Sequence, residues 1–339
     1  RLMKKLLVFL LLILLFACDS DQDKAGRFLL KGNEALNQGQ YGEAIRFYNE
    51  ALALKPDYLE AYNNRGVAYY RDGKYPEAIN NYSTILVQYD TLFPDALRNR
   101  ANAYLADGRY ERAISDLEQL ETVYPDSAYI PFTKGIAFHE AKQYDNAIAS
   151  FEESRAMKPD DAEVLVNQAN SYFMKGELNR ANQLLAEAEA LDATEPNIYN
   201  TLGLIAMEQG ELSKAKTNFD RALSMDPGNP YYFNNRGFLN LQLDSLDAAY
   251  NDIRRAIIGA PENAWAYRNR GILFFKQGRI EDALRNFELA QSMDDQIPLL
   301  YFYWAQTLIE KGKKQRACEL LQQEMESNLE IQALQATCN

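Results

Sequence analysis

The chain has 339 residues, 47% of them apolar, and a formal net charge of −12. The apolar content predicts a folded chain, and the negative charge argues against a nucleic-acid binder, because such proteins present basic surfaces to phosphates. With one histidine and three cysteines in the sequence, there is little material for a zinc site or for a His-dependent nucleophile.

The first predicted element is a signal peptide over residues 1–17. A basic flank precedes an unbroken apolar run of 11 residues, Leu6 to Phe16, which ends at Ala17 and Cys18. A membrane-spanning helix needs about 20 apolar residues, so this run is too short to span a membrane but suits the core of a secretory signal. Leu15, Ala17 and Cys18 resemble the lipobox of bacterial lipoproteins, which implies cleavage before Cys18 and lipidation of it. An ordinary signal peptide with an incidental cysteine and an uncleaved anchor are the alternatives.

Residues 18–24 follow as a short acidic tether. In enteric bacteria, an aspartate directly after the lipidated cysteine resembles an inner-membrane retention signal. In some other Gram-negative groups, acidic residues at this place resemble a surface-export signal. We expect a protein held by lipid in the bacterial cell envelope, most often at the outer membrane, on its periplasmic face or on the cell surface.

From residue 25 onward the sequence repeats itself about every 34 residues. A small marker residue recurs at Gly32, Gly66, Ala101, Gly135, Ala169, Gly203, Gly237, Gly271 and Ala305. Twelve residues after each marker stands an alanine: Ala44, Ala78, Ala113, Ala147, Ala181, Ala215, Ala249, Ala283 and Ala317. Four residues further on stands a large apolar side chain: Tyr48, Tyr82, Leu117, Phe151, Leu185, Phe219, Ile253, Phe287 and Leu321.

This pattern resembles the tetratricopeptide repeat (TPR), and it covers nearly the whole chain after the tether. The resemblance implies an all-α fold, an α-solenoid of about nine helix-turn-helix units that forms a right-handed superhelix. Small residues are then expected where the two helices of a unit cross, because their backbones approach closely there, and the large residue is expected to fill the space between successive repeats. The predicted repeats are 25–58, 59–93, 94–127, 128–161, 162–195, 196–229, 230–263, 264–297 and 298–331, followed by a C-terminal cap or tail over 332–339.

Turn residues support the same units. A glycine that can adopt the left-handed conformation should end most first helices, with Lys142 and Asp244 in its place in two repeats. Prolines should end second helices at Pro56, Pro125, Pro159, Pro227 and Pro261. Asp57 with Glu60 is interpreted as a capping box, and Ser127 and Asn229 as N-caps.

In the TPR family the first helices line a concave groove that binds peptides. Two residues before the marker, this chain carries Asn64, Asn99, Asn167, Asn235 and Asn269. An amide can donate and accept at once, so a row of amides in that groove suits an extended peptide backbone, and it is similar to the asparagine ladder of some superhelical TPR proteins. The alternative is that these amides bond within the fold.

Charged and aromatic residues are further groove candidates. Arg98 and Arg268 are expected on the same face as the asparagines, and Trp265 and Phe275 belong to a C-terminal third that is richer in aromatic residues. Arginines also follow the asparagines at Arg65, Arg100, Arg236 and Arg270, where they either attract a ligand's carboxylates or pair with acids of neighbouring helices. The family's carboxylate clamp is not met, because no repeat has basic residues at both its second and sixth positions.

The C-terminal cysteines remain after lipidation of Cys18. In an oxidising envelope, Cys318 and Cys338 either form a disulfide that locks the last helix or stay as two small buried thiols. Residues 324–339 are expected to extend the last helix or to add a capping helix over an otherwise exposed apolar end.

These features favour an envelope-anchored scaffold that binds partner peptides or protein segments in its groove. A structural or self-assembling envelope protein without a dedicated ligand is the alternative. We find no P-loop, GxSxG or HExxH motif and no nucleophile–base pair, so we expect no enzyme, no catalytic residue, no metal, no cofactor, no nucleic acid and no small-molecule substrate.

Overall fold

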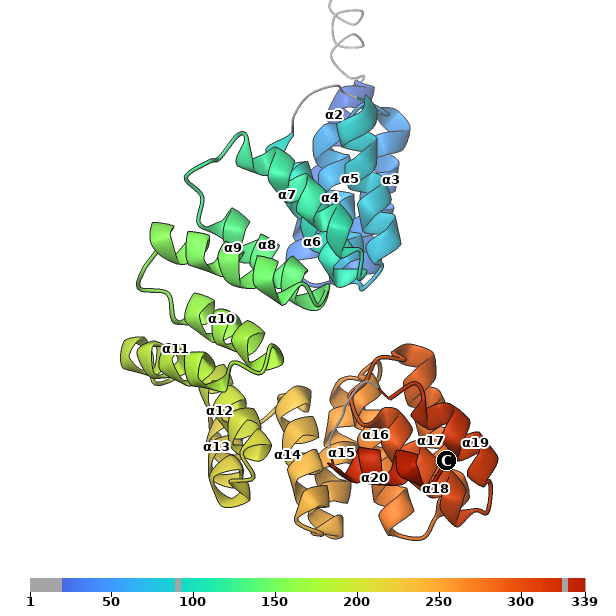
Figure 1. Ribbon diagram of the computed structural model, residues 1–339. Helices are drawn as coiled ribbons and strands as arrows, with labels where there is room; N and C mark the ends of the chain where they lie inside the picture. The colour runs from blue at the N-terminus through green and yellow to red at the C-terminus, as the bar shows by residue number, and fades with distance from the viewer. Residues whose placement is uncertain (1–19, 89–92, 325–328, 339) are drawn as a thin grey trace, which may run out of the picture. The chain divides into compact units, whose positions relative to one another are not determined.

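The computed structural model describes residues 20–88, 93–324 and 329–338 (Figure 1). Within these residues it contains nineteen α-helices and no strand, as expected for an all-α fold. The predicted signal peptide and Cys18 lie outside the described residues. None of the described helices combines the length and the apolar character that crossing a membrane requires.

Eighteen helices form nine hairpins, and a last short helix follows them. We call the first helix of each hairpin the A helix and the second the B helix. The chain divides into two compact units, residues 1–160 and 161–339. The first unit holds α2 (Asp21–Asn37), α3 (Tyr41–Leu54), α4 (Leu59–Arg71), α5 (Tyr75–Gln88), α6 (Pro94–Ala106), α7 (Tyr110–Glu121), α8 (Tyr129–Glu140) and α9 (Tyr144–Met157).

The second unit contains five hairpins and the last helix. Its helices are α10 (Ala162–Met174), α11 (Leu178–Leu191), α12 (Pro196–Glu208), α13 (Leu212–Met225), α14 (Pro230–Gln242), α15 (Leu246–Gly259), α16 (Ala264–Lys276), α17 (Ile280–Met293), α18 (Leu300–Glu310), α19 (Lys314–Leu321) and α20 (Leu329–Ala336). Within each unit every A helix packs on its own B helix, and successive hairpins stack on one another.

The core of each hairpin forms where the repeating residues predict it. All nine recurrent alanines are fully buried, and all nine large side chains that follow them are at most 1% exposed. The large side chain lies directly on the marker of its own repeat: a Cβ added to Gly203 would lie 2.5 Å from Cε1 of Phe219. It therefore fills the crossing inside a hairpin, whereas the sequence predicted that it fills the space between successive repeats.

Marker and large residue are matched in size. Tyrosine or phenylalanine faces a glycine at Gly32, Gly66, Gly135, Gly203 and Gly271. Where the marker is Ala101, Ala169 or Ala305, the residue sixteen positions later is leucine. When the marker on the A helix is alanine instead of glycine, it carries one more methyl group, and the side chain that faces it from the B helix is smaller. Close packing requires this match.

The turns inside the hairpins follow the glycine prediction. Seven glycines have φ between +70° and +79°, and Lys142 and Asp244 adopt φ of +59° and +57° in the two turns without glycine. A side chain with a Cβ is strained in this conformation. Asp244 is also paired with Lys276 at 2.8 Å.

Replacing Lys142 with glycine is expected to raise the free energy of unfolding by about 1 kcal/mol, because the strain disappears. Chemical denaturation measures this change. Gly176→Ala, at the equivalent turn of the next repeat, is the matched control and should lower stability by a similar amount. A Lys142→Gly chain no more stable than the parent would contradict the strain.

Two of the predicted helix caps are wrong. The helix α4 starts at Leu59 with Tyr58 as its N-cap, so Asp57 lies too early to cap it with Glu60. The helix α8 starts after Ala128, so Ser127 contributes only its carbonyl group, which accepts from the N–H of Ile130. Asn229 caps α14 as predicted, since its side chain accepts from the N–H groups of Tyr231 and Tyr232.

The two ends of the solenoid differ from the predicted bounds. The helix α2 begins at Asp21, inside the predicted tether, because Ser20 and Asp23 form a capping box that starts the helix there. At the other end, α20 is a separate helix that begins at Leu329, before the predicted cap. Cys318 of α19 and Cys338 form a disulfide, with their Cα atoms 5.5 Å apart.

Candidate partner-binding face

The asparagine row lies on the A helices, and most of its amides bond to asparagines at other positions of the repeat. In the first unit, Nδ2 of Asn99 donates to Oδ1 of Asn63 at 3.1 Å, and Nδ2 of Asn63 donates to Oδ1 of Asn64 at 3.2 Å. Nδ2 of Asn64 then donates to Oδ1 of Asn33 at 2.9 Å. These bonds link the A helices of three successive hairpins.

The second unit has the same arrangement. Nδ2 of Asn269 donates to Oδ1 of Asn234 at 2.8 Å, Asn234 donates to Asn235 at 3.3 Å, and Asn235 donates to Asn200 at 2.9 Å. Asn269 is fully buried. Each chain of amides therefore holds neighbouring A helices in register, as polar networks do when their members are satisfied.

This arrangement changes the interpretation of the asparagine row. Four of its five members direct an amide N–H to another asparagine, and Asn167 donates to the carbonyl oxygen of Glu163 in its own helix. The amides therefore form hydrogen bonds within the fold, which is the alternative that the sequence left open.

The two candidate arginines occupy the same repeat position but have different surroundings. Arg98 is exposed and pairs with Asp95 at 2.7 Å. Arg268 has Trp265 where Arg98 has Asp95, three residues earlier in the sequence, and it is only 2% exposed. The same repeat position thus holds a surface ion pair in one unit and a buried cation in the other.

Arg268 bonds to neutral oxygens. It donates twice to Oδ1 of Asn269 and once to the carbonyl oxygen of Pro298, at 2.7 to 3.1 Å. Its guanidinium carbon lies 4.6 Å from the ring centre of Phe238 and 4.9 Å from that of Trp265. Among the described residues, no carboxylate lies within ion-pair distance of it, and burial lowers its pKa to about 10. Arg268 remains cationic at neutral pH, below aromatic side chains.

The aromatic side chains on the A helices of the second unit divide into core and surface. Phe302 is 3% exposed, so it belongs to the core. Phe238 and Phe275 are half-buried against the same core. Tyr231 and Trp265 are 54% and 37% exposed at the same repeat position of α14 and α16. We call Tyr231, Trp265 and the half-buried Phe238 and Phe275 the aromatic face.

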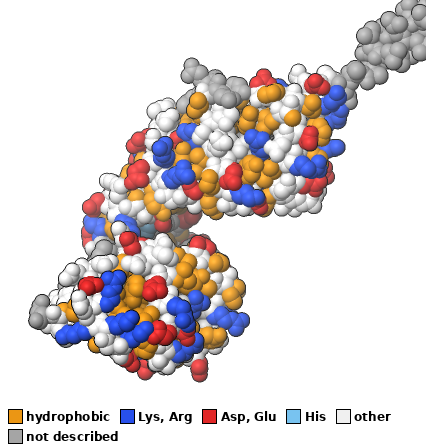
Figure 2. All heavy atoms as spheres, turned by 90° about the vertical axis from the view of Figure 1, so that its right-hand side faces the viewer, with side chains coloured by type: hydrophobic (Ala, Val, Ile, Leu, Met, Phe, Trp, Pro, Cys, Tyr) orange, Lys and Arg blue, Asp and Glu red, His pale blue; other side chains and the backbone are white. Residues whose placement is uncertain are grey.

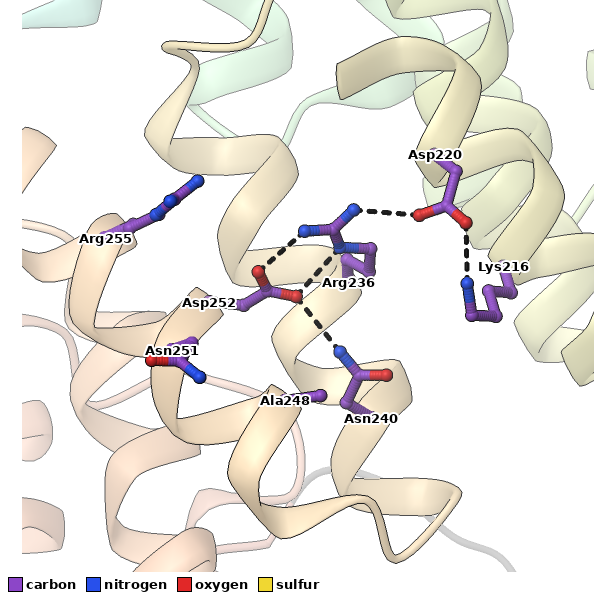
Figure 3. Close-up of a pocket in the computed structure, with 8 residues that line it drawn as sticks. All are labelled: Lys216, Asp220, Arg236, Asn240, Ala248, Asn251, Asp252 and Arg255. Carbon is purple, nitrogen blue, oxygen red and sulfur yellow. Dashed lines mark hydrogen bonds and ion pairs between the residues drawn. The ribbon is translucent and has the colours of Figure 1, made fainter. Parts of the chain in front are cut away.

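The second row of arginines braces the hairpins. Arg236 of α14 binds both oxygens of Asp252 of α15 at 2.8 Å, and its other end reaches Asp220 of α13 at 2.8 Å (Figure 3). Arg100 holds Asp116 in the same way at 2.7 Å. Arg65 and Arg270 reach asparagines at the same spacing of sixteen residues. These arginines connect A helices to B helices, so they stabilise the fold and are not directed at a ligand.

A hollow of about 370 Å³ borders the Arg236 brace. Besides Arg236 and its partners it is lined by Lys216, Asn240, Ala248, Asn251 and Arg255. Its best-placed charges are already paired with one another. On the side drawn in Figure 2, acidic and basic side chains are interspersed, with no area of one sign.

The described residues contain no group of three His, Cys, Asp or Glu side chains that could hold a metal ion. His139 packs on Tyr144 with ring centres 5.5 Å apart, and burial lowers its pKa below 6.5. It is a packed side chain of α8.

His139 predicts a pH dependence of stability. A base with a lowered pKa in the native state binds fewer protons when folded, so its contribution is complete above pH 6.5 and is lost as the pH falls below it. We expect the free energy of unfolding to decrease in that range. His139→Phe, which places there the residue found at Phe173 and Phe275, should remove this part of the dependence. Urea denaturation at several pH values compares the two chains, and identical pH profiles would contradict the assignment.

Repeated hairpins with small residues at their crossings define the chain as an α-solenoid of helical hairpins. Comparison with known families agrees: a profile described as TPR repeat matches residues 32–73, and profiles described as tetratricopeptide repeat match 68–128, 98–162, 138–205 and 196–229. The chain belongs to the tetratricopeptide repeat family, whose members mediate protein–protein interactions.

Curated relatives are similar over short stretches. The Hsp70-Hsp90 organizing protein of Triticum aestivum is 41% identical over 51 residues, 15% of this chain and 9% of that protein. The photosystem I assembly protein Ycf3 of Prochlorococcus marinus (strain NATL2A) is 34% identical over 73 residues, 21% of this chain and 42% of that protein. The chain thus spans less than half the length of these two relatives.

Solved structures share the fold over most of the chain. The human IFIT1 dimer with PPP-AAAA matches with a TM-score of 0.63 at 16% identity, over 95% of this chain and 85% of that chain. The APC/C hetero-tetramer Cut9-Hcn1 matches with a TM-score of 0.61 at 14% identity, over 95% of this chain and 78% of that chain. At these identities the similarity concerns the fold.

Proposed function

We propose that this TPR protein is a membrane-anchored scaffold of the bacterial cell envelope that binds a segment of a partner protein on its A helices. Solenoids of this kind expose a long series of equivalent helices, which suits them to binding extended partners. The lipid anchor at Cys18 is supported by the sequence before it. The outer membrane is the favoured location, on its periplasmic face or on the cell surface.

The aromatic face carries the proposal for partner binding. Tyr231 and Trp265 expose large side chains at the same position of successive repeats, and the half-buried Phe238 lies with Trp265 around the guanidinium group of Arg268. Exposed tyrosine and tryptophan side chains are frequent anchors in protein interfaces. The buried charge of Arg268 beneath Trp265 adds attraction for an electron-rich or acidic partner group.

Catalysis is not part of the proposed function. The polar side chains that the fold brings together on the A helices bond to one another, as the two amide chains do. A self-assembling structural role remains the competing proposal. Sizing of the mature chain in detergent distinguishes the two, because a monomer disfavours self-assembly.

Crosslinking in intact cells with the anchor present, followed by mass spectrometry, tests the scaffold. We expect one or a few reproducible protein partners, and their recovery should fall when Cys18→Ser removes the lipid. The same preparation gives the mass of the N-terminal peptide, and protease treatment of whole cells gives the side of the membrane. Failure to recover any reproducible partner would count against the scaffold, and an N-terminus before Cys18 without an acyl group would refute the anchor.

A further inference from the structure

The C-terminal helix α20 lies against the last hairpin through few contacts. Ile331 is its only fully buried side chain, while Leu329 at its start is 84% exposed. Leu334 and Cys338 pack at the edge of the core of the second unit. Nε2 of Gln335 donates to the carbonyl oxygen of Leu321, the last residue of α19, at 3.3 Å.

These contacts place α20 where the A helix of a further repeat would begin to stack. Cys318, to which Cys338 is bonded, occupies the repeat position that holds a buried aliphatic side chain in Ile45, Ile79, Ile114, Ile148 and Leu284. Glu330 lies near Tyr303 of α18, whose pKa is raised mainly by burial and further by this carboxylate. The short helix therefore lies against α19 at the end of the solenoid, through Leu334, Gln335 and Cys338.

Two attachments hold the tail at this place. Before α20, the carboxylate of Glu324 accepts from the N–H groups of Leu299 and Phe302 at 3.2 and 3.0 Å, at the start of α18. After α20, the disulfide joins Cys338 to α19. A helix of eight residues is marginal by itself in water, so its docking depends on how strongly its ends are held.

We propose that α20 is a redox-controlled cap, which the Cys318–Cys338 disulfide keeps closed over the apolar end of the last hairpin. A dithiol reductant opens it: one thiolate attacks a cysteine sulfur, the S–S bond breaks, and the second thiol of the reductant completes the exchange. The two cysteines gain two electrons and two protons, and the reductant becomes a cyclic disulfide. Without the bond, α20 loses the covalent attachment after its C-terminal end, and Ile331 is its only fully buried side chain. We expect the helix to detach and to leave the end of the solenoid exposed.

Hydrogen exchange with mass spectrometry tests the cap. The full-length chain with Cys18→Ser, in detergent, contains Cys318 and Cys338 as its only cysteines. We expect reduction by a dithiol to accelerate amide exchange in residues 329–336 at least about tenfold. The reason is that the disulfide no longer restricts the detached conformations of α20. Exchange in α2–α9 should remain unchanged, which shows that the first unit stays folded.

Cys338→Ser provides the matched control, since this chain should exchange rapidly over α20 with or without reductant. Equal protection of α20 from amide exchange in the oxidised and the reduced chain would overturn the proposal, because the disulfide would then not control the position of the helix. A reductant effect that persists in Cys338→Ser would also overturn it. Both outcomes are independent of whether the aromatic face binds a partner.

Discussion

Gly203→Ala is expected to lower the free energy of unfolding by about 2 kcal/mol, although alanine favours a helix. The added Cβ would lie 2.5 Å from the ring of Phe219, which is fully buried and has no space to withdraw. Overpacking of a close helix crossing therefore outweighs the gain in helix propensity. Urea denaturation followed by circular dichroism measures the loss.

Phe219→Leu should rescue this variant in part. Alone it leaves a cavity and costs roughly 1–3 kcal/mol, but together with Gly203→Ala it recreates the alanine–leucine pair of three other repeats. We expect the double variant to be more stable than the sum of the single changes by about 1–2 kcal/mol. Strict additivity would contradict the packing described for the crossings.

Gly26→Ala is the matched control for the glycine change. Gly26 lies inside α2, and a Cβ added there meets no atom within 4 Å. The same substitution should therefore raise stability by about 0.5–1 kcal/mol, as helix propensity alone predicts. A loss at Gly26 as large as that at Gly203 would show that the clash is not the cause.

Arg236→Met is the second change with a large expected effect, a loss of about 3–5 kcal/mol. It leaves the carboxylate of Asp252, whose side chain is 7% exposed, with Asn240 as its remaining partner. Adding Asp252→Leu removes the stranded charge and should restore most of the stability. Repeat nine already holds apolar residues at these two positions, Trp304 and Leu320.

Arg98→Met gives the corresponding control on the surface. The side chains of Arg98 and Asp95 are 51% and 63% exposed, so solvent screens the pair and its loss should cost less than about 1 kcal/mol. Thermal or urea denaturation compares the two arginine variants directly. Losses of equal size would contradict the brace that Arg236 forms.

Much of the fold could be predicted because its residues recur. The marker, the alanine and the large side chain predict the helix crossings, and the left-handed turn residues predict where A helices end. Cap positions are harder to predict, since a shift of one residue decides whether a side chain reaches the first turn of the helix. Asp57 and Ser127 each lie one residue too early for α4 and α8.

The polar side chains were harder to interpret. A row of asparagines at one repeat position is compatible with a bound peptide and with a network inside the fold. The deciding partners, Asn33, Asn63, Asn200 and Asn234, lie at other positions of neighbouring repeats and form no obvious row. The arginine braces could have been predicted from the sequence, because an aspartate or asparagine stands sixteen residues after each of these arginines. The burial of Arg268 depends on Trp265 and Phe238 together, which no single repeat reveals.

Partner binding by the aromatic face is tested most directly by photo-crosslinking at single positions. A photoreactive phenylalanine is placed at Trp265 or Tyr231 on the A helices, or at Tyr250 on the B helix α15, which is 47% exposed. If the aromatic face holds the partner, the first two positions give the same protein adduct in intact cells and Tyr250 gives none. Adducts at Tyr250 alone, or adducts of equal yield at all three positions, would contradict the proposed binding face.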